Sequence, residues 1–191
     1  MIRSWIGKFI LRILGWKTVG GTHFPKKCVV IAHPHTSNLD FILFLLARWA
    51  IRVRCHWVGK HTLFRAPFGW FMRMLDGVPV NRSGGRDSVT AIAEVIQERD
   101  VIALGIAPSG SRSLGTEWRS GFYHIAKKAE VPVVMGFIDY KTKTAGLSTF
   151  SIDLTDDITA DMDKIRAFYK GMEGRFPEKQ NPIRLKSEAK D

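Results

Sequence analysis

Cysteine, acidic residues and long uncharged apolar runs are all scarce in this sequence. The two cysteines, Cys28 and Cys55, are widely separated, which excludes a disulfide framework or a zinc pattern and fits a reducing, intracellular compartment. No stretch reaches the roughly 18 uncharged apolar residues that a membrane-spanning helix needs. The best candidate, residues 41–47, is bounded by Asp40 and Arg48 and is interpreted as a buried helix. No secretory signal is expected, because no small-residue cleavage site follows an apolar run.

The shortage of acidic residues makes the chain strongly basic. With 29 Lys and Arg against 18 Asp and Glu, the formal charge is +11. This balance indicates a polyanionic partner, either nucleic acid or a membrane with anionic headgroups. Six Trp and twelve Phe favour a membrane, since these rings suit the water–lipid boundary, although most of them are expected in the core. No nucleic-acid-binding motif is recognised, and the charge is spread along the whole chain, so nucleic-acid binding has the least support.

Short β-branched apolar runs alternate with amphipathic segments along the 191 residues. This alternation predicts a single α/β domain with a mostly parallel central sheet flanked by helices, preceded by an N-terminal amphipathic helix. The division that we expect is an amphipathic helix over 1–18, the globular domain over 19–176 and a polar, flexible tail over 177–191. The predicted strands are 27–32, 53–58, 78–80, 101–107, 131–138 and 150–154, and the main predicted helices are 40–49, 88–99, 123–129 and 162–172.

The first predicted helix has an apolar stripe and cationic flanks. The stripe consists of Ile2, Trp5, Ile6, Phe9, Ile10, Ile13 and Leu14, which recur at helical spacing. Arg3, Lys8 and Arg12 occupy the other faces, and no acidic residue precedes Asp40. A cationic amphipathic helix with tryptophan on its apolar side is typical of an anchor at the membrane surface. The alternative is an ordinary helix packed on the core with its charges solvated.

The loop after the first internal strand carries a histidine five residues before an aspartate, His35 and Asp40. If this loop turns tightly, Asp40 accepts a hydrogen bond from one imidazole nitrogen and leaves the other free to take a proton from an alcohol. Such a pair suits acyl transfer directly to a hydroxyl, without an acyl-enzyme. Because one such spacing is expected by chance in many chains, a simple helix cap by Asp40, Asn38 or Ser37 remains the alternative.

Two later loops set an arginine after a predicted strand, among glycine and hydroxylated residues. These loops are Gly77–Ser83, with Arg82, and Pro108–Ser113, with Arg112. The planar arginine fork suits bidentate phosphate binding, so two of them at one sheet edge with His35 predict a phosphate site. Lys60 is a third candidate cation. Each of these cations alone is otherwise interpreted as a solvated surface charge.

Taken together, these segments resemble the glycerolipid acyltransferase family, whose best-known members acylate lysophosphatidic acid. Four blocks match in order. The first, His35–Asp40 with the serine Ser37, looks like the catalytic His-x4-Asp block, and the second, Gly77–Arg82, looks like the block whose arginine is associated with the acceptor phosphate. The third, Pro108–Ser113, is similar to the Pro-Glu-Gly-Thr-Arg-Ser block, and the fourth, Val131–Val134, resembles the final Val-Pro block. The resemblance spans residues 29–138.

The resemblance implies an enzyme, an O-acyltransferase that moves a fatty acyl group from acyl-CoA or acyl-carrier protein to the hydroxyl of a lysophospholipid such as 1-acylglycerol-3-phosphate. His35 would be the general base and Asp40 its orienting partner, while substrate would be bound by Ser37, Lys60, Arg82, Gly110, Ser111 and Arg112. No metal or bound cofactor is expected. The expected location is the cytoplasmic face of a membrane with anionic lipids, as a peripheral or monotopic protein. Apolar residues of 39–51 and 64–74 are candidates for lining an acyl-chain tunnel.

One position departs from the family pattern. Ser109 stands where the third block normally has glutamate, and Ser111 replaces threonine but keeps its hydroxyl. The loss of the carboxylate bears on which acceptor fits. It also supports an alternative function, a catalytically silent protein of the same fold that binds anionic lipid. The intact pair of His35 and Asp40 favours the enzyme, because a binding module does not need it.

Overall fold

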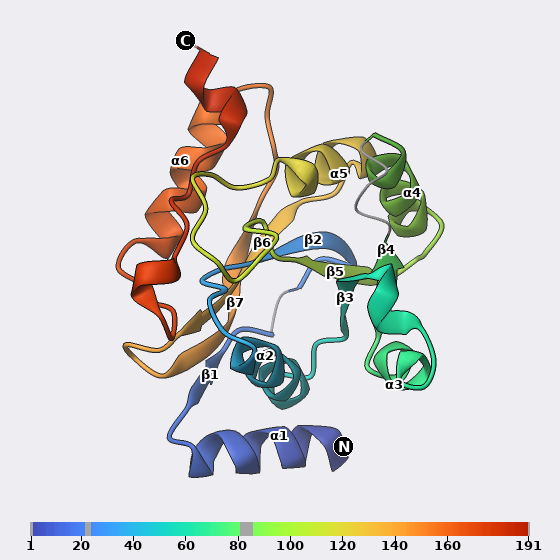
Figure 1. Cartoon of the computed structure of the whole chain (residues 1–191), viewed down its shortest axis with the longest axis vertical. Coiled ribbons are helices and arrows are strands. Elements are labelled where there is room, and N and C mark those ends of the chain that lie inside the picture. Colours follow the sequence, from blue (N-terminus) through green and yellow to red (C-terminus); the bar gives the residue numbers. More distant parts are fainter. Residues whose placement is uncertain (1, 22–23, 81–85, 191) are drawn as a thin grey trace.

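A central sheet of seven strands organises the chain, in the order β1-β7-β6-β2-β5-β3-β4. The computed structural model describes residues 2–21, 24–80 and 86–190 (Figure 1). All strand pairs are parallel except β6 with β7. The predicted α/β class with a mostly parallel sheet is therefore confirmed. The strands are β1 (Lys17–Val19), β2 (Lys27–Ala32), β3 (Cys55–Lys60), β4 (Gly77–Val80), β5 (Ile102–Ile106), β6 (Val133–Asp139) and β7 (Thr144–Ile152).

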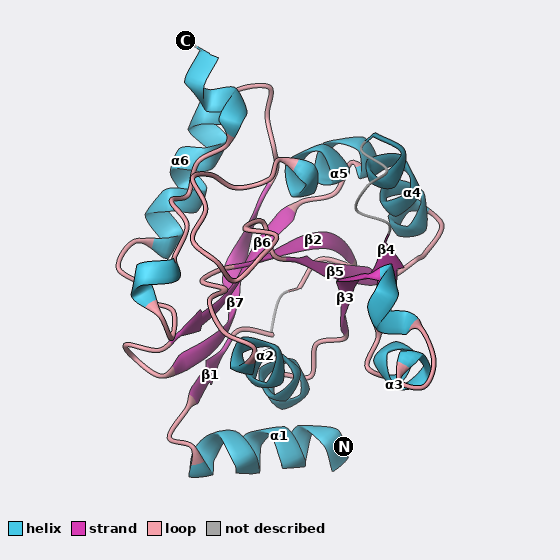
Figure 2. Cartoon of the chain, viewed as in Figure 1, coloured by secondary structure: helices cyan, strands magenta, loops and turns pink. Residues whose placement is uncertain are grey.

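Helices cover both faces of the sheet (Figure 2). On one face α2 (Leu39–Ala50) lies against the strands, and α1 (Ile2–Ile13) packs on the outside of α2. The other face is covered by α4 (Arg86–Gln97), α5 (Gly121–Ala129) and α6 (Ile158–Tyr169). The short helices η1 (His61–Phe64) and α3 (Gly69–Met74) lie beside β3 and the edge strand β4. Two further short helices, η2 (Pro177–Lys179) and η3 (Lys186–Lys190), follow α6.

Two elements near the sheet edge differ from the sequence prediction. β1 was not predicted, because three residues are too few to show an alternating pattern. β7 begins at Thr144, six residues before the predicted start, and β1 lies outside it in the sheet. The early half of β7 contains Ala145 and Gly146, residues with low strand propensity, and its pairing with β6 decides the structure there.

The C-terminal segment packs on the domain. Leu185 is only 1% exposed, and its backbone forms an isolated bridge with Trp118. The side chain of Asn181 is also buried and accepts a hydrogen bond from the backbone of Gly115 (2.7 Å). The described part of the tail, residues 177–190, is therefore in contact with the domain, where the polar composition had predicted a flexible segment. The division into 1–18, 19–176 and 177–191 stays a prediction.

Small residues bring α1 close to α2. Ser4, Gly7 and Leu11 are its buried residues, and a Cβ added to Gly7 would lie 2.6 Å from the carbonyl oxygen of Leu46. The large apolar side chains of α1 point elsewhere: exposed fractions are 78% for Ile2, 76% for Trp5, 57% for Phe9 and 68% for Ile13. The predicted stripe thus packs little of its apolar surface on the core. Among the described residues, no helix is both long and apolar enough to cross a membrane.

Candidate active site

The histidine and aspartate singled out in the sequence meet where β2 ends and α2 begins. His35 lies in the loop after Ala32, and Asp40 is in the first turn of α2. Their atoms Nδ1 and Oδ2 are 3.5 Å apart, with the side chains 20% and 3% exposed. This is at the long end of hydrogen-bond distances, and His–carboxylate pairs in active sites commonly tighten when substrate binds. A partner at Nδ1 leaves Nε2 as the nitrogen that can accept a proton.

Three further donors hold the Asp40 carboxylate. Oδ2 accepts hydrogen bonds from the backbone N–H groups of Thr36 and Ser37, both at 2.8 Å, and Oδ1 accepts one from the hydroxyl of Tyr140 at 2.8 Å. Burial raises the pKa of Asp40, but hydrogen bonds from His35, the Ser37 backbone and Tyr140 together outweigh it, so the pKa is lowered. The carboxylate is therefore ionised at neutral pH and fixed in orientation beside His35.

His33, the other histidine of the same loop, is buried among aromatic rings. Its ring lies 5.0 Å from that of Trp118 and 5.1 Å from that of Tyr169, measured between centroids. Burial, with a smaller effect of His35, lowers the pKa of His33 to about 3. The ring is thus neutral at physiological pH, and Gln180 Nε2 lies 3.3 Å from its Nε2. These contacts give His33 a packing role and leave His35 as the histidine beside the carboxylate.

The loop after β5 is joined to the His35 loop by an arginine. Arg112 Nε donates to the carbonyl oxygen of Ser37 at 3.2 Å. Gly110 has a φ of +68°, and a Cβ there would lie 2.7 Å from Arg119 Nε, so both the backbone and the space favour glycine. Ser109 Oγ donates to the carbonyl oxygen of Ser111 at 3.0 Å, a contact within the loop.

A cavity of about 340 Å³ lies beside these loops, between α2 and the sheet. His35, Asp40, Lys60, Gly110, Ser111 and Arg112 line it, so the structure brings six of the eight predicted site residues together. Ser37 is buried, its hydroxyl accepts a hydrogen bond from the Leu39 backbone (3.2 Å), and it is not among the lining residues. Arg82 lies outside the described residues. The substrate roles of all eight stay predictions.

The cavity extends from the loops into an apolar interior. Phe41, Phe44 and Ala47 of α2 line one side, and Val30 and Leu147 of the sheet line the other. Of the two segments expected to line a tunnel, residues 39–51 contribute, whereas none of 64–74 is among the lining residues that the structure describes. The long apolar wall beside a polar mouth suits an amphipathic ligand.

Sequence reasoning missed the residues that support the site from distant parts of the chain. Tyr140 directly follows β6, which pairs with β2, so parallel pairing brings it to the loop after β2. The sequence signal for Tyr140 was its position directly after a predicted strand. That signal is not enough to place it beside Asp40, because the order of strands in the sheet is not visible in the sequence. The C-terminal segment also contributes: Phe176 N donates to Thr36 Oγ1 at 3.2 Å. Among the described residues, no cluster of His, Cys, Asp or Glu has a geometry that could hold a metal ion.

The chain thus has a His–Asp pair at the carboxyl edge of a mostly parallel sheet, beside an apolar cavity, which is where enzymes of this fold class place reactive groups. Residues 17–136 match the family model described as Acyltransferase. The chain belongs to this acyltransferase family, which confirms the resemblance drawn from its four sequence blocks and the enzyme class that it implied.

One solved structure shows the same fold. The chain is similar to the crystal structure of the 1-acyl-sn-glycerophosphate (LPA) acyltransferase PlsC from Thermotoga maritima, with a TM-score of 0.59 and 17% identity. The similarity covers 86% of this chain and 74% of that one. At this identity the comparison establishes the fold. A search of curated proteins gave no match.

Proposed function

We propose that this protein transfers a fatty acyl group from a thioester, acyl-CoA or acyl-carrier protein, to the hydroxyl of a lysophospholipid such as 1-acylglycerol-3-phosphate. One observation carries the proposal: the His35–Asp40 pair, 3.5 Å apart, lies at the polar mouth of an apolar cavity in a member of the acyltransferase family. The pair supplies the base, and the cavity supplies room for an acyl chain.

In the proposed reaction His35 Nε2 takes the proton from the acceptor hydroxyl as its oxygen attacks the thioester carbonyl. Asp40 stabilises the imidazolium that forms, because its carboxylate stays ionised at Nδ1. The tetrahedral intermediate then collapses: the C–S bond breaks, the proton passes from His35 to the departing thiolate, and the new ester remains. Atoms and charges balance without a metal, a cofactor or an acyl-enzyme.

Cations at the cavity mouth fit an anionic acceptor. Lys60, at the end of β3, and Arg112, after β5, both line the cavity. Since β3 and β5 are parallel neighbours, their carboxyl ends lie at the same sheet edge as His35. An acceptor phosphate between these cations would leave its hydroxyl near the base. Arg82, which follows β4, is proposed to belong to the same group from its sequence position alone.

Two exposed apolar surfaces fit a protein that works at the membrane. The outer face of α1 presents Ile2, Trp5, Phe9 and Ile13 with Arg3, Lys8 and Arg12 nearby in the helix. The second, the α3 surface, consists of the exposed side chains Leu63, Phe68, Trp70, Phe71 and Met74. Aromatic side chains beside cations suit an interface with anionic headgroups. We propose peripheral association with the cytoplasmic face, which would deliver the lipid acceptor to the cavity mouth.

The test is acyl transfer by the purified protein with labelled acyl-CoA or acyl-carrier protein. The acceptors are lysophosphatidic acid and lysophospholipids with larger or neutral headgroups. The proposal predicts a labelled diacyl product, fastest with the anionic acceptors, and no label retained on the protein without acceptor. A folded, lipid-binding protein that forms no product with any pairing would instead support the silent lipid-binding alternative.

A further inference from the structure

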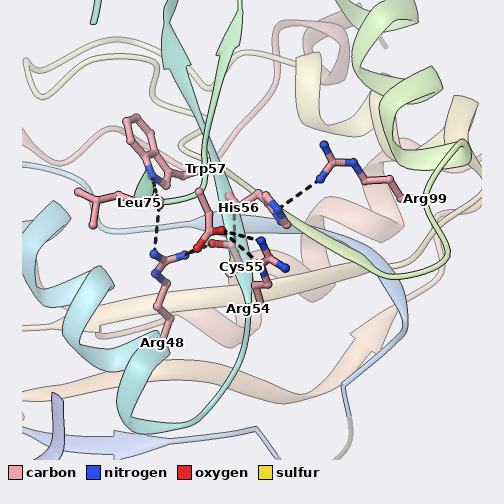
Figure 3. A network of polar contacts seen from close by, with 8 residues as sticks. Arg48, Arg54, Cys55, His56, Trp57, Leu75 and Arg99 are labelled. Atoms are coloured by element: carbon pink, nitrogen blue, oxygen red, sulfur yellow. Dashed lines mark hydrogen bonds and ion pairs between the residues drawn. The ribbon is translucent and has the colours of Figure 1, made fainter. Parts of the chain in front are cut away.

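A buried arginine lies at the end of the cavity opposite His35. Arg48, in the last turn of α2, lines the cavity with a side chain that is 4% exposed. Its Nη1 donates to the carbonyl oxygen of Cys55 (2.6 Å) and pairs with Asp76 (3.0 Å), and its Nη2 donates to the carbonyl oxygen of Leu75 (3.0 Å) (Figure 3). Cys55 begins β3, and Leu75 and Asp76 precede β4. The guanidinium is therefore at the amino edge of the sheet, whereas His35 is at the carboxyl edge.

The partners of Arg48 are themselves held in place. Arg54 donates to Asp76 Oδ1 from Nε (3.2 Å) and Nη2 (3.1 Å), and Trp57 Nε1 donates to the carbonyl oxygen of Leu75 (2.9 Å) (Figure 3). A planar guanidinium that satisfies three fixed acceptors cannot rotate aside without breaking several charge-assisted hydrogen bonds. Within the described part of the chain, its Nε is buried and has no hydrogen-bond partner. The terminal methyl group of an acyl chain that reached this guanidinium would contact a polar group that is fixed in place.

The distance from Asp40 to Arg48 along α2 corresponds to a definite length of acyl chain. Asp40 and Arg48 are eight residues apart on α2, about 12 Å along the helix axis. An extended chain advances about 1.2 Å per bond, from ~3.5 Å for the three bonds of a residue, so this depth holds roughly ten bonds.

We propose that Arg48, fixed by the carbonyl oxygens of Cys55 and Leu75, ends the acyl cavity and limits the acyl chain to about ten to twelve carbons. This inference rests on the proposed acyltransferase function, because it assigns the acyl group to the cavity. It makes Arg48 a specificity-determining residue for the donor, distinct from the cations at the cavity mouth.

The test measures how affinity depends on chain length, without requiring turnover. Saturated fatty acids from about six to about sixteen carbons are titrated by calorimetry, since each buried methylene raises affinity about fourfold. In wild type the affinity should rise with each methylene and stop rising near ten to twelve carbons, the depth estimated above. In Arg48→Met, where an apolar side chain replaces the guanidinium, two further methylenes should fit and raise the affinity roughly fifteenfold.

Asp76→Asn is the matched control. It removes the ion pair but leaves the guanidinium with its bonds to the carbonyl groups of Cys55 and Leu75, so the length limit should not move. Gly105→Ala is a second variant in the opposite direction. The added Cβ would lie 3.1 Å from the carbonyl oxygen of His56, 3.4 Å from Cys55 Sγ and 3.9 Å from Phe44 Cζ. It would narrow the cavity partway along its length, and the limit should shift to shorter chains.

The results separate this inference from the proposed function. The length limit would be wrong if wild-type affinity kept rising beyond about fourteen carbons at the same increment per methylene. An unchanged limit in both Arg48→Met and Gly105→Ala would equally overturn it, as would an Asp76→Asn shift equal to that of Arg48→Met. If Arg48→Met does not fold, the position of the wild-type limit decides, and Gly105→Ala shows whether the chain occupies this cavity. A clear limit that moves as expected, with no acyl transfer by any variant, would support the inference and contradict the proposed function.

Discussion

Removal of the Tyr140 hydroxyl tests how the Asp40 carboxylate is positioned. Tyr140 reaches Asp40 across one hundred residues of sequence and donates to Oδ1 at 2.8 Å. The change Tyr140→Phe keeps the ring and its edge contact with Trp16, whose centroid is 5.0 Å away, and removes only the hydrogen bond. The remaining donors to Asp40, the backbone N–H groups of Thr36 and Ser37, stay in place.

The structure gives the size of the expected effect. Because the acceptor is a buried, ionised carboxylate, this hydrogen bond should contribute about 1.5–3 kcal/mol to the free energy of unfolding at neutral pH. The lowered pKa of Asp40 fixes the pH dependence. Its stabilisation is complete above the ordinary value of 3.8 and is lost as pH falls through the folded-state pKa, so the difference between wild type and Tyr140→Phe should shrink at low pH. With Asp40 less restrained beside His35, kcat should fall about tenfold, or ~1.4 kcal/mol.

A double-mutant cycle provides the assay. Urea unfolding of wild type, Tyr140→Phe, Asp40→Asn and the double variant should give a coupling free energy of about 1 kcal/mol or more. Additive effects within about 0.5 kcal/mol, together with an unchanged kcat in Tyr140→Phe, would refute the positioning role of this tyrosine.

Three further predictions concern other parts of the chain. The pKa of His33 is about 3 in the folded state and 6.5 in the unfolded state, so the unfolded state binds the proton first as pH falls. The free energy of unfolding should therefore fall by about 1 kcal/mol between pH 6 and 5. His33→Gln should lessen this fall, as measured by urea unfolding. The double variant Trp5→Ser, Phe9→Ser should have at least tenfold lower affinity for anionic liposomes in a co-sedimentation assay, because each buried aromatic side chain contributes about 1.5–3 kcal/mol. Its circular dichroism spectrum should match that of wild type. Ser109→Glu should change the relative rates with different acceptors more than those with different donors; an acceptor profile identical to that of wild type would contradict this.

The sheet and the loop that carries His35 and Asp40 could be predicted because their signals are local. Continuous β-branched runs such as residues 28–31 are typical of buried parallel strands, and the spacing of His35 and Asp40 is visible in one stretch. Their contact depends only on a tight turn between a strand and a helix. The first helix was also predictable, and most of its apolar stripe is exposed in the structure. The membrane interpretation of that stripe stays a prediction.

Other parts of the site depend on pairings that no local pattern reveals. Tyr140 reaches Asp40 because β6 lies beside β2, and Arg48 reaches Leu75 and Asp76 because β4 lies beside β3. Within its own segment Arg48 marks only the end of an apolar run, and nothing there indicates a network at the end of a cavity. The strand order, which is a property of the whole chain, decides both contacts.

We propose that His35 acts as the base for acyl transfer. The most direct test compares wild type with His35→Ala in single-turnover acyl transfer from labelled thioester to lysophosphatidic acid, with liposome binding measured in parallel. His124→Ala, at an exposed histidine of α5 away from the cavity lining, is the matched control. We predict that His35→Ala loses transfer by a factor of about 10³ or more, comparable with the contribution of a general base, while folding and liposome binding match wild type. Transfer by His35→Ala at the wild-type rate would contradict the account.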